Sequence, residues 1–377
     1  MNATIVPMYE AQLPSDWQYI LNDAGCEALF CATEDIHERA NKEVVPSVDT
    51  LHGSMCFDSS LGESYGFQTA LEAAKERMKH ITGGYNDGVI EPSVNDLADL
   101  VYTSGTTGKP KGVELTHGNL SSNIQSVKNM VDDPTQFLRP TDRSLAFLPW
   151  AHSYGQTCEL WAGMAHGGSI GVCRGVTHIL EDLSLVQPTI LFSVPTLYKR
   201  VYDGVHGMIQ NSSPLKQKLM NRALELARMD RLAKENEKSL GFLERMQFKV
   251  LNGLVLDKIR ARFGGKLRLG FLGGAACPRE ILEFMDDLGI PVYEGYGLTE
   301  TSPIITLNVP GKRKLGTVGL PIPNFDVVIC NENGEPVQRG EEGEICCSGP
   351  SVMRGYHNKP VETNDVITVA PDGVSRL

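Results

Sequence analysis

The stretch that decides the fold reads Tyr102-Thr-Ser-Gly-Thr-Thr-Gly-Lys-Pro-Lys-Gly112, with three glycines, four Ser or Thr hydroxyls and two lysines in eleven residues. Glycine lets backbone N–H groups turn toward an anion, and the hydroxyl and ammonium groups add donors and positive charge. The loop is not a Walker A loop, because Gly105 and Gly108 are three residues apart and proline follows Lys109. A flexible polar hairpin has a similar composition, but the complete string favours a loop that binds a polyphosphate.

Short apolar runs flank this loop on both sides. Leu97–Tyr102 and Gly112–Leu115 predict two strands that the loop joins. Strands this short and apolar are typical of a largely parallel sheet covered by helices, so we predict a mixed α/β fold. The other expected helices are Thr69–Ile81, Asn119–Met130 and Ala162–His166. The other expected strands are Ser144–Leu148, Gly168–Val172 and Thr189–Val194.

A strand, a tight turn, a helix and a second strand follow one another in the second half. The strand is Leu267–Leu272, the turn Gly273–Ala276 and the helix Pro278–Leu288, and the second strand lies near Tyr293. After Pro310 short β-rich runs alternate with turns, which indicates a small antiparallel β domain. We therefore predict a first α/β subdomain (1–135), a second (136–309) with a helical insertion (200–260), and a β segment (310–377).

Composition and charge exclude several classes of protein. Of the 377 residues, 41% are hydrophobic and 21% are charged, as in ordinary globular proteins. The net charge of −11 argues against nucleic-acid binding. The nine cysteines form no CxxC pair, which favours reduced thiols. We see no secretory signal pattern and no apolar run of ~20 residues, so we expect a cytoplasmic protein.

The stretch Arg200–Arg268 differs in charge from the rest of the chain. It holds fifteen Lys or Arg and seven Asp or Glu, in a pattern of long amphipathic helices such as Leu215–Asp230. One hypothesis is a basic face for peripheral contact with an anionic membrane or for a phosphorylated ligand. On that hypothesis, neutralising Arg222, Arg228 and Arg231 weakens liposome binding. The alternative is a solvated helical hairpin packed on the core.

Four ordered blocks carry a resemblance to a known family. Tyr102–Gly112 resembles the phosphate-loop signature of the AMP-forming acyl-adenylate superfamily, and Gly295-Tyr-Gly-Leu-Thr-Glu-Thr301 resembles its second hallmark. Gly273-Gly-Ala275 and Gly316-Thr-Val-Gly319 resemble further blocks in the same order. The resemblance implies an acyl-CoA synthetase-like N-terminal domain. That domain has two α/β subdomains with mostly parallel sheets, a nucleotide site in the crevice between them, and a partial small β-barrel after them.

The residues of these blocks have chemistry that suits an acyl-adenylate site. The carboxylate of Glu300 suits a hard cation such as Mg²⁺, the hydroxyl of Thr299 suits a phosphate, and Tyr296 is able to stack on a purine. A surface carboxylate is the alternative for Glu300. We assign the Mg²⁺ to Glu300 and Thr103. The residues expected to contact the nucleotide are Thr103, Ser104, Gly105, Thr106, Thr107, Gly108, Lys109, Gly273, Gly274, Ala275, Tyr296, Gly297 and Thr299.

The predicted catalytic residues are Lys109, Thr299, Glu300 and His152. His152 lies in Pro149-Trp-Ala-His-Ser-Tyr-Gly155, which resembles the family block beside the acyl pocket, and a satisfied core histidine is the alternative. Cys277 lies at the start of a predicted helix, where a thiol pKa is often lowered. We interpret Cys277 as structural, because the reaction of this family needs no protein nucleophile.

The resemblance implies the reaction as well. A carboxylate attacks the α-phosphorus of ATP, pyrophosphate leaves, and the thiol of coenzyme A then takes the acyl group from AMP, with catalysis by positioning and electrostatics. Ser193–Lys199, Val255–Gly265 and Val292–Asn308 resemble the long-chain fatty acyl-CoA synthetase branch, so we predict a long-chain fatty acid–CoA ligase. The alternatives are adenylation of another acid and a non-catalytic protein that binds ATP or fatty acid.

The resemblance further predicts that parts of the family fold lie outside this chain. Members of the family are longer, and they place a Thr-Gly-Asp block that grips the ribose just beyond the position of Leu377. They also carry a C-terminal domain with a catalytic lysine. We therefore expect a partial active site, with recognition of ligands but no completed thioester formation.

Overall fold

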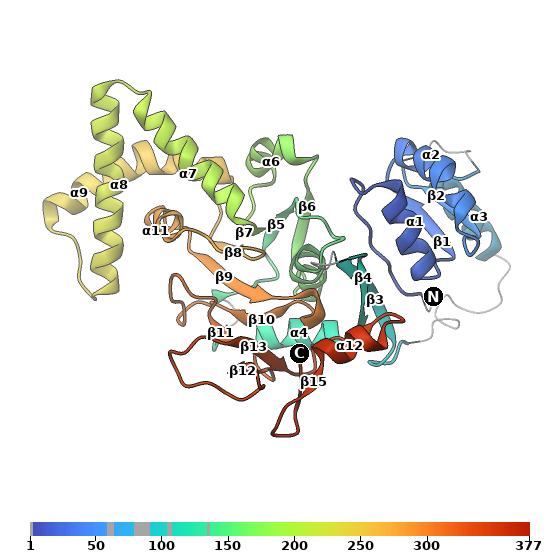
Figure 1. The fold of residues 1–377 in the computed structure, drawn as a ribbon. Helices are drawn as coiled ribbons and strands as arrows, with labels where there is room; N and C mark the ends of the chain where they lie inside the picture. The colour runs from blue at the N-terminus through green and yellow to red at the C-terminus, as the bar shows by residue number, and fades with distance from the viewer. Residues whose placement is uncertain (1–2, 59–63, 79–90, 104–107, 134–135) are drawn as a thin grey trace. The chain divides into compact units, whose positions relative to one another are not determined.

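The computed structural model describes residues 3–58, 64–78, 91–103, 108–133 and 136–377, and Figure 1 shows its helices and strands. The chain forms two compact units, Met1–Asn119 with Met353–Thr368 and Leu120–Val352 with Val369–Leu377. The predicted α/β fold class is confirmed. The three predicted segments (1–135, 136–309 and 310–377) remain a prediction, and the compact units cut across them because residues 353–368 belong to the first unit.

The first unit contains one parallel and one antiparallel sheet. In the parallel sheet, β1 (Ala28–Cys31) pairs with β2 (Gly53–Cys56). In the antiparallel sheet, β4 (Lys111–Thr116) lies between β3 (Leu97–Thr103) and β14 (Gly355–Tyr356). The loop with the polyphosphate signature therefore joins two neighbouring strands, as predicted. The helices of this unit are α1 (Pro14–Asp23), α2 (Glu34–Glu43), α3 (Phe67–Met78) and α12 (Pro360–Val366).

The second unit is built on a five-stranded sheet in the order β11-β10-β9-β8-β7. Its parallel part consists of β7 (Ile190–Ser193), β8 (Leu269–Leu272) and β9 (Val292–Gly297). The strands β10 (Ile304–Leu307) and β11 (Leu320–Pro321) continue it in antiparallel fashion. A separate parallel pair is formed by β5 (Arg143–Ala146) and β6 (Ser169–Val172).

Helices cover both faces of this sheet, which explains its unbroken apolar strands. All residues of β7 and β8 are buried. Successive side chains point to opposite faces, so Leu191 and Leu272 pack in one core while Phe192 and Phe271 pack in the other. The helices are α4 (His117–Lys128), α5 (Ala162–Ala165), α6 (Ile179–Val186), α7 (Pro195–Gln210), α8 (Pro214–Glu235), α9 (Phe242–Leu251), α10 (Asp257–Arg260) and α11 (Arg279–Asp287).

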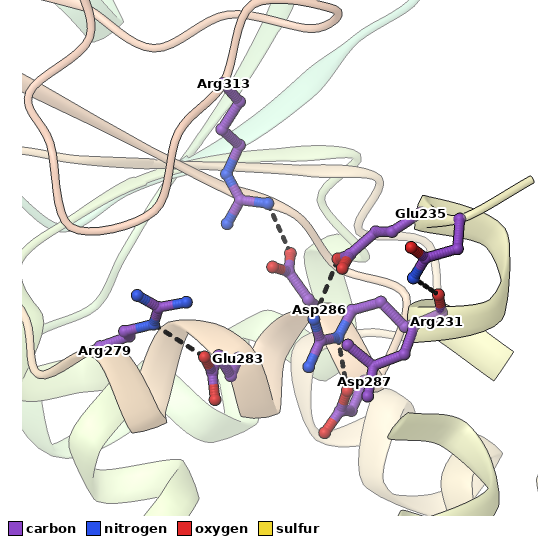
Figure 2. A network of polar contacts seen from close by, with 9 residues as sticks. Arg231, Glu235, Arg279, Glu283, Asp286, Asp287 and Arg313 are labelled. Atoms are coloured by element: carbon purple, nitrogen blue, oxygen red, sulfur yellow. Dashed lines mark hydrogen bonds and ion pairs between the residues drawn. The ribbon is translucent and has the colours of Figure 1, made fainter. Parts of the chain in front are cut away.

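Ion pairs fasten the long helix α8 to α11, and α11 to the loop after β10 (Figure 2). Arg231 of α8 donates hydrogen bonds to Asp287 (2.7 Å) and Glu235 (3.0 Å), and Arg313 donates to Asp286 (2.7 Å). Burial raises the pKa of Asp286 and Asp287, and their arginine partners oppose that shift. The basic helical insertion is thus packed on the core, as its second interpretation predicted.

The segment after Pro310 is rich in strands. Here β12 (Asp326–Cys330) pairs with β13 (Glu344–Ser348) in antiparallel fashion, and β15 (Thr368–Val369) pairs with β16 (Ser375–Arg376). The small β-barrel predicted for this segment stays a prediction. Among the described residues, no helix has the length and apolarity needed to cross a membrane.

Candidate nucleotide and acyl site

The second hallmark block forms β9 and a turn of 3₁₀-helix (Thr299–Thr301) that leads into β10. Its glycines are required by close packing. A Cβ on Gly297 would lie 1.8 Å from the carbonyl oxygen of Pro303, and a Cβ on Gly295 would lie 2.9 Å from Leu307. The sequence of this block therefore specifies how closely its backbone approaches the next strand.

Buried hydrogen bonds fix the turn between these strands. The side chain of Asn123 donates to the carbonyl oxygens of Thr301 (3.1 Å) and Ile304 (2.9 Å). The Thr301 hydroxyl donates to the carbonyl of Pro303 (2.6 Å) and accepts from the backbone N–H of Leu298 (3.0 Å). Asn123 and Thr301 are fully buried. The turn thus holds the partly exposed Thr299 and Glu300 in place.

Contacts join this turn to two other predicted blocks. The hydroxyls of Ser153 and Thr299 lie 3.2 Å apart. The ring of Tyr154 lies against the backbone of Gly273, where an added Cβ would be 3.3 Å from Cζ of the tyrosine. The structure therefore brings Pro149–Gly155, Gly273–Ala275 and Gly295–Thr301 together.

The fourth block, Gly316–Gly319, is tied to the same sheet. The side chain of Asn308 donates to the carbonyl of Thr317 (2.6 Å). Burial raises the pKa of Glu294 on β9, and the nearby backbone of Gly316 opposes that shift. Gly319 has a φ of +86°, and a Cβ there would lie 2.1 Å from the backbone of Leu307. No side chain larger than hydrogen fits at this position.

Tyr296 and Glu300 come from adjacent parts of this hairpin. Burial raises the pKa of Tyr296, and the nearby Cys347 and Glu300 raise it further. Among the described residues no group of three or more His, Cys, Asp or Glu gathers as a metal cage. Mg²⁺ usually binds through one or two carboxylates, with water and substrate phosphates completing its shell. One carboxylate from Glu300 fits that mode of binding.

His152 lies at the surface of the second unit. Its Nδ1 accepts a hydrogen bond from the backbone N–H of Tyr154 (3.1 Å). Although the side chain is exposed, the protein around it desolvates the ring and lowers its pKa. A neutral ring with Nδ1 as acceptor carries its proton on Nε2. His152 therefore presents an N–H donor.

Cys277 lies next to the start of α11, after the Gly273–Ala275 turn. Burial raises the pKa of its thiol to about 11, and the nearby Glu294 raises it as well. The thiol is therefore protonated at neutral pH and is a poor nucleophile. This supports the structural interpretation of Cys277.

Sequence reasoning missed a π-helix at Tyr154–Trp161 and a buried acid within it. Glu159 is 1% exposed, and burial raises the pKa of its carboxyl to about 7. Ser144 is close enough to lower that pKa slightly, yet neither carboxyl oxygen has a well-formed hydrogen bond to a described residue. A π-helix is rare and often marks a functional site, but no sequence pattern signals it.

A small cavity lies beside this π-helix, and a second cavity adjoins it. Glu159 and Ser144 line a cavity of about 20 Å³. A second cavity, of about 230 Å³, shares Leu138, Arg139 and His166 with it. The smaller cavity thus combines an acid with apolar side chains such as Phe192.

The phosphate loop belongs to the first unit. Thr103 ends β3, and Gly108 and Lys109 precede β4, whereas Ser104, Gly105, Thr106 and Thr107 lie outside the described residues. The Lys109 ammonium lies 5.0 Å from the ring centre of Tyr19. Lys109 and Gly108 are exposed. The lysine thus presents its charge at the surface of its unit.

Comparison with known proteins identifies the family. The sequence model of the AMP-binding enzyme family matches residues 1–357. The chain belongs to this family. Among curated relatives, the peroxisomal long chain acyl-CoA synthetase 7 of Arabidopsis thaliana is 29% identical over 96% of this chain and 50% of its own length. Long-chain-fatty-acid–CoA ligase 1 of Homo sapiens is 29% identical over 96% of this chain and 51% of its own length.

The AMP-binding chain thus spans about half the length of the curated relatives it matches. Solved structures agree on the fold. The ATP-bound MatB of Rhodopseudomonas palustris has a TM-score of 0.68 at 24% identity and covers 98% of this chain and 59% of its own. The anthranilate CoA ligase AuaEII in complex with anthranoyl-AMP has a TM-score of 0.67 at 19% identity, covering 99% and 62%.

Proposed function

We propose that this chain supplies the acyl-adenylate site of an ATP-dependent, AMP-forming long-chain fatty acid–CoA ligase. One observation carries the proposal beyond family membership. The second unit brings three separate sequence blocks into direct contact, with Ser153 against Thr299 (3.2 Å) among the contacts, and ties the fourth block to the same sheet. The names of the curated relatives, which are 29% identical, support the long-chain assignment.

ATP and coenzyme A are the proposed co-substrates. Tyr296 offers a flat face to adenine, and the exposed backbone of Gly274 and Ala275 leaves room for a base to approach closely. Thr103–Lys109 is proposed to bind phosphates, with Lys109 supplying a positive charge. The hydroxyl of Thr299 is proposed to donate to a phosphate oxygen.

Glu300 is the proposed protein ligand of Mg²⁺. When bound there, the ion would neutralise charge on the phosphates of ATP. The second metal ligand expected from the sequence, Thr103, remains a prediction.

The proposed chemistry has two steps. A carboxylate oxygen of the fatty acid attacks the α-phosphorus of ATP, and the bond from that phosphorus to pyrophosphate breaks. The sulfur of coenzyme A then attacks the acyl carbon, and AMP leaves with the electron pair. His152, with its proton on Nε2, is proposed to donate to an oxygen of the acid, and Thr299 is proposed to stabilise charge on the phosphoryl group.

The test is calorimetric binding of two non-hydrolysable acyl-adenylate mimics, palmitoyl and acetyl, to the 377-residue chain with Mg²⁺. The proposal predicts that the palmitoyl mimic binds more tightly by at least about tenfold, because a long chain buries more apolar surface. Equal binding would contradict the long-chain assignment. Binding of neither by a chain whose circular dichroism shows it to be folded would contradict the adenylate site.

A second candidate is the activation of a polar carboxylic acid. The observation that favours it is Glu159, a buried carboxyl on the π-helix that follows His152, where a tunnel for a fatty acyl chain calls for apolar groups. A mimic with an amino group on its acyl chain, added to the same calorimetric series, separates the candidates. If that mimic binds best and Glu159→Leu reverses the preference, the polar acid is the substrate.

A further inference from the structure

Helix α9 exposes an apolar stripe. Its members are between 57% and 77% exposed. They lie at Phe242, Leu243, Met246 and Val250, with Leu254 just beyond the end of the helix. The contrast with α11 is sharp, because Ile281, Leu282, Phe284 and Met285 of α11 are all buried. A contiguous stripe of large exposed side chains is unusual for a protein surface and marks an interaction site.

The opposite face of α9 is fixed to the protein. Leu251 is buried in the core of the second unit, and Phe248 packs against it. Gln247 accepts a hydrogen bond from Arg222 of α8 (3.1 Å). Figure 1 shows α8 and α9 at the side of this unit away from β9 and β10. The stripe is therefore held outward by a helix whose inner face is already satisfied.

Positive charges flank the stripe. Arg245 and Lys249 of α9 are exposed, and neither makes an ion pair in the part of the chain that the structure describes. At 100° per residue they lie beside Phe242 and Met246 on the helix surface. The one acid of the helix, Glu244, accepts a hydrogen bond from the backbone N–H of Gly241 (3.1 Å).

The charge of the surrounding segment is of the same sign. Residues 200–268 hold fifteen basic and seven acidic side chains, a net charge of +8, although the whole chain is −11 and the remainder is therefore −19. An anionic surface thus attracts this segment and repels the rest, which favours an approach with α9 foremost.

We propose that α9 docks on an anionic lipid bilayer. Phe242, Leu243 and Met246 enter the boundary between headgroups and acyl chains, and Arg245 and Lys249 bind lipid phosphates. This is the arrangement of an interfacial amphipathic helix, with large apolar residues on one side and cations beside them. The docking surface is independent of the proposed ligase activity, because none of these residues belongs to the candidate site.

Arg245 and Lys249 are better test residues for membrane contact than the arginines named from the sequence. Arg231 is 14% exposed and is paired with Asp287, so its loss would unfasten α8 from α11 (Figure 2). Arg222 is paired with Glu225. Neutralising these two residues would confuse stability with lipid binding, whereas Arg245 and Lys249 are free of that difficulty.

The test is co-sedimentation of the 377-residue chain with unilamellar vesicles of phosphatidylcholine, with and without phosphatidylserine. We expect binding to the anionic vesicles only. The pair Phe242→Ser and Met246→Ser should weaken it at least about tenfold, and the pair Arg245→Glu and Lys249→Glu by more than about fivefold for each charge removed. The control pairs are Val172→Ser with Leu185→Ser, and Lys42→Glu with Arg339→Glu, which alter equally exposed side chains elsewhere.

Each outcome decides the proposal. Unchanged binding in the control pairs, with loss in the α9 pairs and normal circular dichroism, supports it. The proposal is wrong if the chain does not bind anionic vesicles, or if the control pairs lose as much. It is also wrong if light scattering shows a dimer that Phe242→Ser with Met246→Ser converts to a monomer without any vesicle binding, because a second copy then covers the stripe.

Discussion

The two hairpins that carry the hallmark blocks are held by different forces. At the β9–β10 hairpin of the second unit, Thr301 and its partner Asn123 of α4 are buried and hydrogen-bonded, and Gly297 has no room for a Cβ. In β3–β4 of the first unit, Lys109 is exposed and rests near the ring of Tyr19. One block thus specifies a backbone shape and the other presents charge. Substitution of the buried residues of β9–β10 should therefore reduce stability, whereas substitution of the exposed Lys109 should reduce ligand binding alone.

The largest expected effect is that of Gly297→Ala. The added Cβ would meet the carbonyl oxygen of Pro303 at 1.8 Å, so the hairpin must open. We expect a loss of more than about 3 kcal/mol in the free energy of unfolding, measured by urea denaturation followed by circular dichroism. The matched control is Gly253→Ala, where the nearest atom to the new Cβ is 3.8 Å away. Equal unfolding midpoints for the two variants would show that the hairpin is not tightly packed.

A second prediction concerns the pH dependence of stability that Glu159 causes. This residue lies on the π-helix, outside both hairpins. Burial raises the pKa of this carboxyl from 4.5 to about 7 in the folded protein. Its contribution to stability is therefore greatest below pH 4.5 and is lost as the pH rises through about 7. The loss amounts to about 3 kcal/mol.

The measurement is urea unfolding of the protein and of Glu159→Gln across this pH range. The glutamine variant lacks the titrating group, so its free energy of unfolding should not change through this group. The free energy of unfolding of the unaltered protein should therefore fall relative to that of the variant as the pH rises. A constant difference would mean that Glu159 is ionised or hydrogen-bonded in the folded state.

Asn123→Ala should have a smaller effect. It removes three side-chain hydrogen bonds to the turn, two donated to carbonyls and one accepted from the backbone N–H of Ile304 (3.4 Å), and leaves the carbonyls of Thr301 and Ile304 without this donor. We expect a loss of about 2 kcal/mol in urea unfolding. Asn221→Ala, at an exposed position of α8, serves as the control and should leave the midpoint unchanged. A similar loss in both variants would contradict the role of Asn123.

The smallest expected change in free energy is that of Lys109→Met, and it should appear in binding alone. We expect about tenfold weaker binding of ATP with Mg²⁺ by calorimetry, because one charge-assisted contact to phosphate is lost. The urea midpoint should not change, since the side chain is exposed. Lys42→Met, also exposed, is the control. If Lys109→Met lowers the urea midpoint and leaves ATP binding unchanged, Lys109 serves stability and not binding, which contradicts the comparison between the hairpins.

Much of the secondary structure of the second unit was predictable, because residues close in sequence mark where its strands and helices begin and end. The strand, turn and helix at Leu269–Asp287 begin and end within two residues of the predicted limits, since Gly and Pro mark their ends. The two strands around the phosphate loop were predicted for the same reason, although their antiparallel pairing was not. The hallmark blocks were recognised from their residue strings, and the structure places three of them within contact of one another.

The features that sequence could not supply depend on long-range packing. The pairing of β14 with β4 joins residues 355–356 to the first unit, and no local pattern names such a partner. The π-helix at Tyr154–Trp161 differs from an α-helix only in which carbonyl each N–H selects. The exposure of Phe242 and the burial of Glu159 likewise depend on which neighbours cover each side chain.

The central claim is that the hallmark hairpin of the second unit binds an acyl adenylate. The most direct measurement is calorimetric binding of the palmitoyl-adenylate mimic to the chain and to Thr299→Ala and Glu300→Gln, with Thr177→Ala and Glu332→Gln as exposed controls. Our account predicts at least about tenfold weaker binding for each site variant and no change for the controls. Tight binding that survives both site substitutions in folded protein would contradict it.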